Sequence, residues 1–166
     1  EEAEPAARAE TPAPPASDEA APEKPDAPLA GVRVLIVEDG VDNRRLIDFF
    51  LRRSGAETAH AEDGRQGLDA VLAAVRSDQA FGLIIMDMQM PVMDGYEATA
   101  RLREAGVATP ILALTAHAMV GDRERCLAAG CDDYATKPIE RAALVQQCVR
   151  LVREAEAAAR TSRAAA

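Results

Sequence analysis

The stretch Phe81–Glu97, FGLIIMDMQMPVMDGYE, decides the fold, because it joins a buried strand to an abrupt turn. Its apolar run Leu83–Met86 is too short to cross a membrane and has the length of a buried strand. The run stops at one carboxylate, Asp87, and the following MQMPVMDG must turn because it holds a proline and an Asp-Gly pair. The stretch therefore predicts a strand that displays an acidic side chain at its carboxyl end, where open α/β sheets bind ligands.

Apolar runs and helical patterns alternate in the same way along the rest of the chain. The predicted strands cover residues 32–37, 57–61, 83–86, 110–114 and 133–136, and the predicted helices cover about 42–54, 63–76, 95–105, 120–129 and 140–153. Such alternation is typical of a doubly wound α/β fold, a five-stranded parallel sheet with helices on both faces. Right-handed crossovers then bring the carboxyl ends of all five strands to one edge of the sheet.

The composition limits the classes of protein to which the chain can belong. It has 166 residues, a net charge of -9 and 3% aromatic residues, which suits one domain and argues against nucleic-acid binding. No apolar run is long enough for a transmembrane helix, so we expect no direct membrane contact. Cys126, Cys131 and Cys148 are odd in number and form no CxxC pair, which favours a reducing, cytoplasmic location over a disulfide framework or a zinc site.

Both ends of the chain differ in composition from its middle. Residues 1–30 are rich in proline, alanine and acidic residues without apolar periodicity, and we interpret them as a disordered linker. The start lacks a secretory signal and an initiating methionine, so we interpret the sequence as a fragment of a longer chain. Residues 31–153 are the predicted folded domain. The tail 154–166, EAEAAARTSRAAA, favours helix but has no apolar face, so we expect it to fray.

Polar side chains stand where the strands end, at the shared carboxyl edge. The first strand is followed by Glu38 and Asp39, the third by Asp87, the fourth by Thr115 and the fifth by Lys137. Three unpaired carboxylates this close would repel one another unless a cation joined them, and a hard ion such as Mg²⁺ suits their oxygens. A metal, a hydroxyl and a lysine together suit a phosphoryl group, and a carboxylate can itself be the nucleophile that forms an aspartyl-phosphate.

Four segments resemble the receiver domain of two-component response regulators. They are VLIVEDGVDNRRL, IIMDMQMPVMDGYEA, ILALTAHAM and GCDDYATKPI, and the likeness covers residues 32–153. The segments MPVMDGYEATARLRE and LTAHAMVGDRERCLAAG look most like receivers attached to hybrid sensor histidine kinases. The resemblance implies a flavodoxin-like fold with strand order 2-1-3-4-5. It also implies a phosphoacceptor module of a phosphorelay, in the C-terminal part of a hybrid histidine kinase.

The resemblance assigns the central roles in the site residue by residue. It implies that Asp87 accepts a phosphoryl group from a histidine of a partner. Asp39 and Asp87 would bind Mg²⁺ directly, together with the backbone carbonyl of Gln89, and Glu38 would bind it through water. Lys137 would bind the phosphoryl oxygens. The chain would catalyse its own phosphorylation and dephosphorylation, and we expect no independent turnover of small molecules.

Further residues would respond to the phosphoryl group or tune its lifetime. In the family, Thr115 moves to bind the group and Tyr134 rotates inward as the aromatic switch partner. Gln89 and His117 stand two residues beyond Asp87 and Thr115, at places that face the phosphoryl group and tune its hydrolysis. The Lys137–Pro138 peptide bond is cis in the family, and the sequence alone shows only that a cis bond is plausible before proline.

One position departs from the family pattern. Gly40 stands where receivers of hybrid kinases usually carry asparagine, which removes an amide near the metal and loosens the turn.

The expected partner is the dimerisation and phosphotransfer domain of a histidine kinase or a histidine phosphotransfer protein. A weak homodimer through the fourth and fifth helices is compatible with the sequence.

Two other functions are weighed against the phosphoacceptor. A phosphatase of the haloacid dehalogenase kind also uses a strand-end aspartate, Mg²⁺ and lysine, but it typically carries a second acid where Gln89 stands here. Glutamine cannot transfer protons as that acid does. An unphosphorylated pseudo-receiver would act only as an interaction domain, and the intact Asp87, Thr115 and Lys137 argue against it.

Overall fold

The computed structural model describes residues 27–165, and residues 1–26 and 166 lie outside the described part. The strands are β1 (Arg33–Val37), β2 (Glu57–Ala61), β3 (Leu83–Asp87), β4 (Ile111–Thr115) and β5 (Asp133–Thr136). The helices are α1 (Val41–Arg53), α2 (Gly64–Arg76), α3 (Gly95–Glu104), α4 (Val120–Ala129) and α5 (Arg141–Ala164). Neighbouring strands pair in parallel in the order β2-β1-β3-β4-β5. The predicted flavodoxin-like topology is confirmed.

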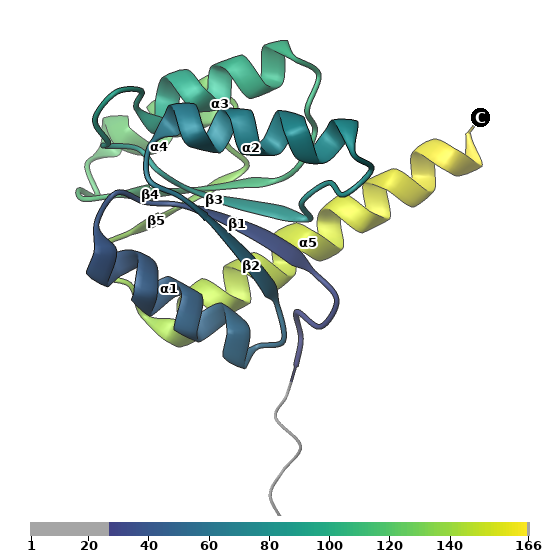
Figure 1. The fold of residues 1–166 in the computed structure, drawn as a ribbon, viewed down its shortest axis with the longest axis horizontal. Helices are drawn as coiled ribbons and strands as arrows, with labels where there is room; N and C mark the ends of the chain where they lie inside the picture. The colour runs from purple at the N-terminus through teal and green to yellow at the C-terminus, as the bar shows by residue number, and fades with distance from the viewer. Residues whose placement is uncertain (1–26, 166) are drawn as a thin grey trace, which may run out of the picture.

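Helices cover both faces of the sheet, α2, α3 and α4 on one and α1 and α5 on the other (Figure 1). Alternate residues of β3 enter the two cores. Ile84 and Met86 pack on the side of α2 to α4, and Leu83 and Ile85 pack on the side of α1 and α5. Every residue of β3 is buried, because a parallel sheet with helices on both faces has no solvent side. This explains why the sequence of β3 is an apolar run, and it places Asp87 at the end of a strand that is buried throughout.

The strand register brings the predicted polar residues to one level at the carboxyl edge. Val37 at the end of β1 pairs with Met86, so Glu38 follows beside Asp87. On the other side of β3, Asp87 pairs with Leu114, and the next residue of β4 is Thr115. Thr115 in turn pairs with Thr136 of β5, and its carbonyl accepts the Lys137 N–H at 2.8 Å. Four segments distant in sequence thus end side by side.

The folded domain begins before the predicted boundary at Gly31. Leu29 is fully buried in the core between the sheet, α1 and α5, and its N–H donates to the Ser54 carbonyl at 2.8 Å. Residues 27–30 are therefore part of the domain, and the predicted linker is too long at this end. One apolar residue among prolines and alanines has no periodicity, so the sequence pattern does not reveal it. The rest of the linker prediction, for residues 1–26, lies outside the described residues.

The C-terminal tail also differs from its prediction. Helix α5 continues without a break to Ala164, so residues 154–164 are helical rather than frayed, and they project beyond the sheet (Figure 1). Alanine, glutamate and arginine favour helix strongly, and extending an existing helix avoids the cost of nucleating a new one. No helix within residues 27–165 is long and apolar enough to cross a membrane.

Arg103 at the end of α3 joins three segments at the opposite, amino edge of the sheet. Its guanidinium donates to the carbonyls of Gly130, Val107 and Thr109 at 2.7 to 2.9 Å, and to the Asp132 carboxylate at 2.9 Å. The same Asp132 oxygen accepts the N–H of Ile111 at the start of β4. The arginine thus satisfies backbone groups that the helix and strand ends leave open.

We expect Arg103→Met to lower the free energy of unfolding by about 2 kcal/mol, because half-buried carbonyls lose their donor. Urea denaturation monitored by circular dichroism measures the change. Arg101→Met is the matched control, since Arg101 lies on the same helix and makes only an exposed pair with Glu97, which contributes little. Equal, small losses for both variants would contradict the role of Arg103.

Candidate functional site

Three carboxylates converge at the carboxyl edge of the sheet. Glu38 after β1 is 1% exposed, Asp39 beside it is exposed, and Asp87 at the end of β3 is 3% exposed. One carboxylate oxygen of each lies within 4.8 Å of the others. The convergence predicted from the strand ends is therefore present, and it concentrates negative charge where two of the three acids are removed from water.

Asp87 is held by two donors. Its Oδ1 accepts the Gln89 N–H at 3.1 Å, and its Oδ2 accepts the Lys137 ammonium at 3.1 Å. Its pKa is raised from 3.8 to about 6, because burial and the Glu38 charge raise it by more than the Gln89 N–H and Lys137 lower it. Near neutral pH the carboxylate is therefore ionised, oriented and shielded from bulk water. These are the properties of a carboxylate that can act as a nucleophile.

Lys137 lies between two of the buried acids. Its Nζ is 2.8 Å from Glu38 Oε2 and 3.1 Å from Asp87 Oδ2. Burial lowers the pKa of Lys137, but the close contact with Glu38 and the charges of both acids outweigh it, so the pKa is raised and the ammonium stays charged. The contact with Glu38 Oε2 is an ion pair without hydrogen-bond geometry, which leaves that buried oxygen without a hydrogen-bond donor. Lys137 thus pairs with two of the three carboxylates in the cluster.

The donor set fits Mg²⁺. All the candidate ligand atoms are oxygens, which is what this hard ion prefers. Lys137 neutralises only part of the charge, and the incompletely bonded Glu38 oxygen is aimed into the same cluster. A divalent cation would balance the remaining charge, while the exposed Asp39 leaves a path for an ion that keeps several waters.

The Thr115 hydroxyl makes a hydrogen bond within its own loop. Its Oγ1 donates to the His117 carbonyl at 2.8 Å, within the loop that leads into α4. Tyr134 on β5 is half-buried against the core on the side of α2 to α4. His117 is exposed. The Lys137–Pro138 peptide bond is cis, as the resemblance implies.

Comparison with known proteins identifies the family to which this chain belongs. A model of the response regulator receiver domain family matches residues 34–149. The chain belongs to this family. It is 43% identical over 111 residues to hybrid signal transduction histidine kinase I of Dictyostelium discoideum, a match that covers 64% of the chain and 6% of that kinase. The receiver thus spans only a small part of the length of this curated relative.

Two solved receiver structures have the same fold. One is the receiver domain of sensor histidine kinase PA1611 from Pseudomonas aeruginosa, with a magnesium ion coordinated in its active-site cleft. It is 41% identical, with a TM-score of 0.65 over 74% of this chain and 98% of that one. The other is the Ssk1 receiver of Saccharomyces cerevisiae in complex with the histidine phosphotransfer protein Ypd1. It is 31% identical, with a TM-score of 0.64 over 70% of this chain and 86% of that one.

Gly40 makes a specific contact in this receiver rather than a loose turn. Its N–H donates to Glu38 Oε1 at 2.9 Å, and a Cβ at this position would lie 3.0 Å from the same oxygen. The absence of a side chain therefore leaves room for the carboxylate to fold back over the turn. Gly40 is also the N-cap of α1 and supplies no side-chain cap.

Two residues near the site were missed by sequence reasoning. Arg44 on α1 donates through Nη1 to the Glu38 carbonyl at 2.8 Å. Gly95 at the start of α3 packs directly on the backbone of Asp87 and Met88. A glycine at the first helical position after an Asp-Gly turn was a visible signal of close packing. The reach of Arg44 back to the preceding strand had no signal, because it depends on how α1 leaves β1.

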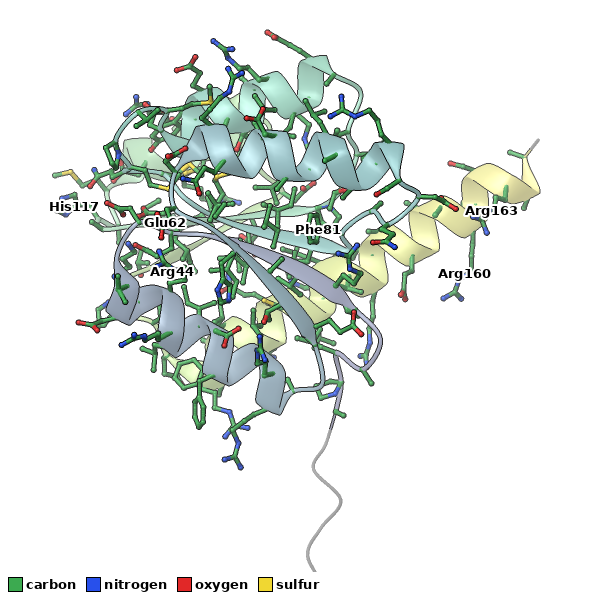
Figure 2. The ribbon with its side chains drawn as sticks, viewed as in Figure 1. Arg44, Glu62, Phe81, His117, Arg160 and Arg163 are labelled. Atoms are coloured by element: carbon green, nitrogen blue, oxygen red, sulfur yellow. The ribbon has the colours of Figure 1, made fainter. Side chains whose placement is uncertain are left out.

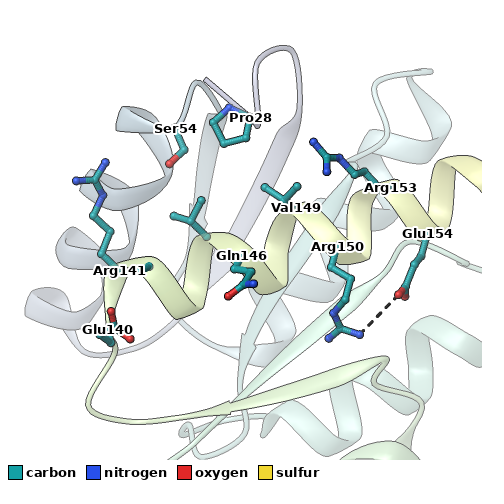
Figure 3. A pocket seen from close by; sticks show the side chains of 11 residues that line it. Pro28, Ser54, Glu140, Arg141, Gln146, Val149, Arg150, Arg153 and Glu154 are labelled. Atoms are coloured by element: carbon teal, nitrogen blue, oxygen red, sulfur yellow. Dashed lines mark ion pairs between the residues drawn. The ribbon is translucent and has the colours of Figure 1, made fainter. Parts of the chain in front are cut away.

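One hollow on the described surface lies away from the receiver's acidic site. It is a groove of about 800 Å³ along the outer side of α5, with Pro28 and Ser54 on the opposite wall (Figure 3). Its lining includes Val145, Val149 and Arg153 but none of the carboxylates of the site. The three carboxylates therefore lie at the carboxyl edge of the sheet, away from this groove.

Proposed function

We propose that this receiver accepts a phosphoryl group on Asp87 and changes conformation in response. The observation that supports it most is the position of Asp87, a buried carboxylate with one oxygen on a backbone N–H and the other on the Lys137 ammonium. A pseudo-receiver needs no such arrangement. A phosphatase would need a second acid where Gln89 stands, and family membership supports a receiver.

The reaction is a group transfer between two nucleophiles. An oxygen of the Asp87 carboxylate attacks the phosphorus of a phosphohistidine, an O–P bond forms, and the N–P bond breaks. The imidazole nitrogen leaves with the electron pair and takes up a proton from solvent. Lys137 is placed to balance charge on the phosphoryl oxygens, because its Nζ already lies against the attacking carboxylate. The main chain at Gln89 holds the other carboxylate oxygen in place.

A bound Mg²⁺ would supply charge neutralisation at the phosphoryl oxygens. Asp39 and Asp87 are the residues of this chain placed to hold it, with the Gln89 carbonyl as a third ligand. Glu38 lies behind them and would bind the ion through a water molecule. The oxygen cluster supports this assignment, as does the magnesium ion in the PA1611 receiver. The buried Glu38 also anchors Lys137 and so fixes the distance between the ammonium and the acceptor.

The switch would begin at Thr115. Its hydroxyl now donates to the His117 carbonyl, and turning it toward a phosphoryl group on Asp87 exchanges that bond for one to a charged acceptor. The exchange favours the phosphorylated state because a bond to an ionised oxygen is the stronger one. Tyr134, half-buried on the neighbouring strand, would follow into the space that Thr115 leaves. Gln89 and His117 would adjust the access of water to the phosphoryl group.

The partner is a protein that carries a phosphohistidine. The Ypd1–Ssk1 complex shows a receiver bound to a histidine phosphotransfer protein, and we extend that pairing to this chain. The similarity to hybrid kinases supports a place for this receiver within a longer kinase chain. In that setting the phosphoryl group would come from a phosphohistidine of a kinase domain or pass on to a phosphotransfer protein.

Incubation with acetyl phosphate and Mg²⁺ tests the proposal. We expect intact-protein mass spectrometry to show the gain of one phosphoryl group, because the carboxylate is ionised and Lys137 is in place. With a chelator in place of Mg²⁺, uptake should fall steeply. Wild-type protein that gains no phosphoryl group with Mg²⁺ present would favour the pseudo-receiver.

A further inference from the structure

Arg44, one turn into α1, holds the turn that carries the acidic pair Glu38 and Asp39. Its guanidinium Nη1 donates to the Glu38 carbonyl at 2.8 Å, and its backbone N–H donates to the Gly40 carbonyl at 2.9 Å. Its Nη2 lies 3.5 Å from Glu62 Oε1, just after β2. Figure 2 shows Arg44 and Glu62 next to one another between the start of α1 and the sheet. One side chain thus ties together the ends of β1 and β2 and the start of α1.

The side chain of Arg44 is enclosed rather than solvated. It is 13% exposed, an unusual position for a guanidinium on a helix surface. Its neighbour Arg45 is exposed, and no hydrogen bond or ion pair of the Arg45 side chain is found within residues 27–165. The two arginines are adjacent in sequence, so the difference comes from where α1 places each side chain. Burying a guanidinium is costly unless it is paired and hydrogen-bonded, and Arg44 has the Glu38 carbonyl and the Glu62 carboxylate as partners.

Asp39 depends on the turn for its position. It is exposed, and in the described part of the chain no donor binds its carboxylate. The place from which its side chain extends is therefore set by the backbone of residues 38–40. The bonds that fix this backbone are the Glu38 N–H to Ala61, the Gly40 N–H to Glu38 Oε1, and the two bonds from Arg44. Arg44 supplies two of the four and is the only side-chain donor among them.

We propose that Arg44 is a positioning residue that holds the Glu38–Gly40 turn so that Asp39 faces Asp87 and can share a metal ion with it. The inference rests on the proposed function, since it concerns the same Mg²⁺ site. It touches neither the metal nor the phosphoryl group, and acts through the backbone that carries a ligand.

The test is the affinity for Mg²⁺, titrated into the full chain and followed by amide chemical shifts in NMR spectra. We expect Arg44→Met to weaken Mg²⁺ binding about tenfold, which is the usual effect of removing a residue that orients a metal ligand. Arg44→Lys should restore part of the affinity, because an ammonium can donate one bond to the Glu38 carbonyl. Arg45→Met is the matched control and should bind Mg²⁺ as the wild type does.

A metal-free measurement separates positioning from stability. The Gly40 amide shift should change in Arg44→Met without Mg²⁺, because the turn relaxes when the Glu38 carbonyl loses its donor. A lower melting temperature with an unchanged Gly40 shift and unchanged Mg²⁺ affinity would assign Arg44 a structural role only and overturn the inference. If Arg44→Met does not fold, Arg44→Lys decides: wild-type affinity and a wild-type Gly40 shift in that variant would overturn it as well.

The inference and the proposed function fail in different ways. If the wild-type chain binds no Mg²⁺, the proposed site itself is wrong. If the wild type and Arg45→Met bind Mg²⁺ and Arg44→Met binds it equally well, only the positioning role of Arg44 is wrong.

Discussion

Replacing Asp87 by asparagine is expected to abolish phosphoryl uptake from acetyl phosphate. An amide lacks the negative charge with which a carboxylate oxygen attacks phosphorus. Glu38 is the other buried acid among the described residues, and we expect it not to take over, because in the proposed site it lies behind Asp39 and Asp87 and would reach the metal only through water. Intact-protein mass spectrometry with Mg²⁺ present measures the result as the complete loss of the phosphorylated species.

The same substitution should stabilise the metal-free protein. Burial raises the pKa of Asp87 from 3.8 to about 6, so the folded state holds a proton more tightly than the unfolded chain. Ionisation therefore opposes folding: the cost is absent below pH 3.8, grows as the pH rises to about 6, and is complete above it. A pKa change of this size corresponds to about 2 to 3 kcal/mol in the free energy of unfolding. Asp87→Asn should gain that stability over the wild type in a chelator at neutral pH, and lose the advantage in acid.

Asp69→Asn is the control for both measurements, because Asp69 is an exposed residue of α2 that pairs only with Arg65. It should take up phosphoryl groups as the wild type does and show no pH-dependent gain in stability. A phosphorylated Asp87→Asn protein would mean that another residue is the acceptor. A variant no more stable than the wild type at neutral pH would mean that Lys137 compensates the buried charge fully.

The parts of this receiver that could be predicted from sequence are those set by local patterns and by rules of handedness. The unbroken run Leu83–Met86 predicts a strand enclosed on both faces, and β3 is buried throughout. Alternation with helices predicts parallel strands, so Asp87, Thr115 and Lys137 had to follow strands at one edge. The strand register in the structure then places them at one level. The composition of the site was therefore predictable.

The connections made by long side chains could not be predicted. Arg103 and Arg44 both reach backbone carbonyls of other segments, and nothing in their sequence spacing distinguishes them from the exposed Arg101 and Arg45. The direction of the Thr115 hydroxyl is likewise a choice between two acceptors that only the folded loop presents. Such contacts depend on the angle between elements, which hydrophobic periodicity does not predict.

The edges of the domain were misjudged for a related reason. Leu29 is one apolar residue without a pattern, and its burial depends on a gap left by α1 and α5. The tail of α5 has no apolar face, but its helix is already nucleated by the buried residues Leu144, Cys148 and Leu151. In both places, contacts with neighbouring elements decide whether the segment is ordered. A short window of sequence does not contain those contacts.

Gly95→Ala is expected to lower the free energy of unfolding by about 3 kcal/mol, the upper part of the range for overpacking a core. A Cβ at Gly95 would overlap the Asp87 carbonyl oxygen and lie 2.8 Å from Met88 Cε. The side chain of Met88 can move, but the carbonyl belongs to the end of β3 and cannot move without shifting the acceptor. Phosphoryl uptake at Asp87 should therefore slow together with the loss of stability, which urea denaturation measures.

Gly121→Ala is the matched control, because Gly121 is also near the start of a helix but a Cβ there would meet nothing within 4 Å. Alanine favours helix over glycine, so this variant should be as stable as the wild type or more stable by up to about 1 kcal/mol. The two substitutions add the same methyl group and should change stability in opposite directions. A Gly95→Ala protein as stable as Gly121→Ala would show that α3 can move away from β3 at no cost, and that the close approach of the helix does not fix the position of Asp87.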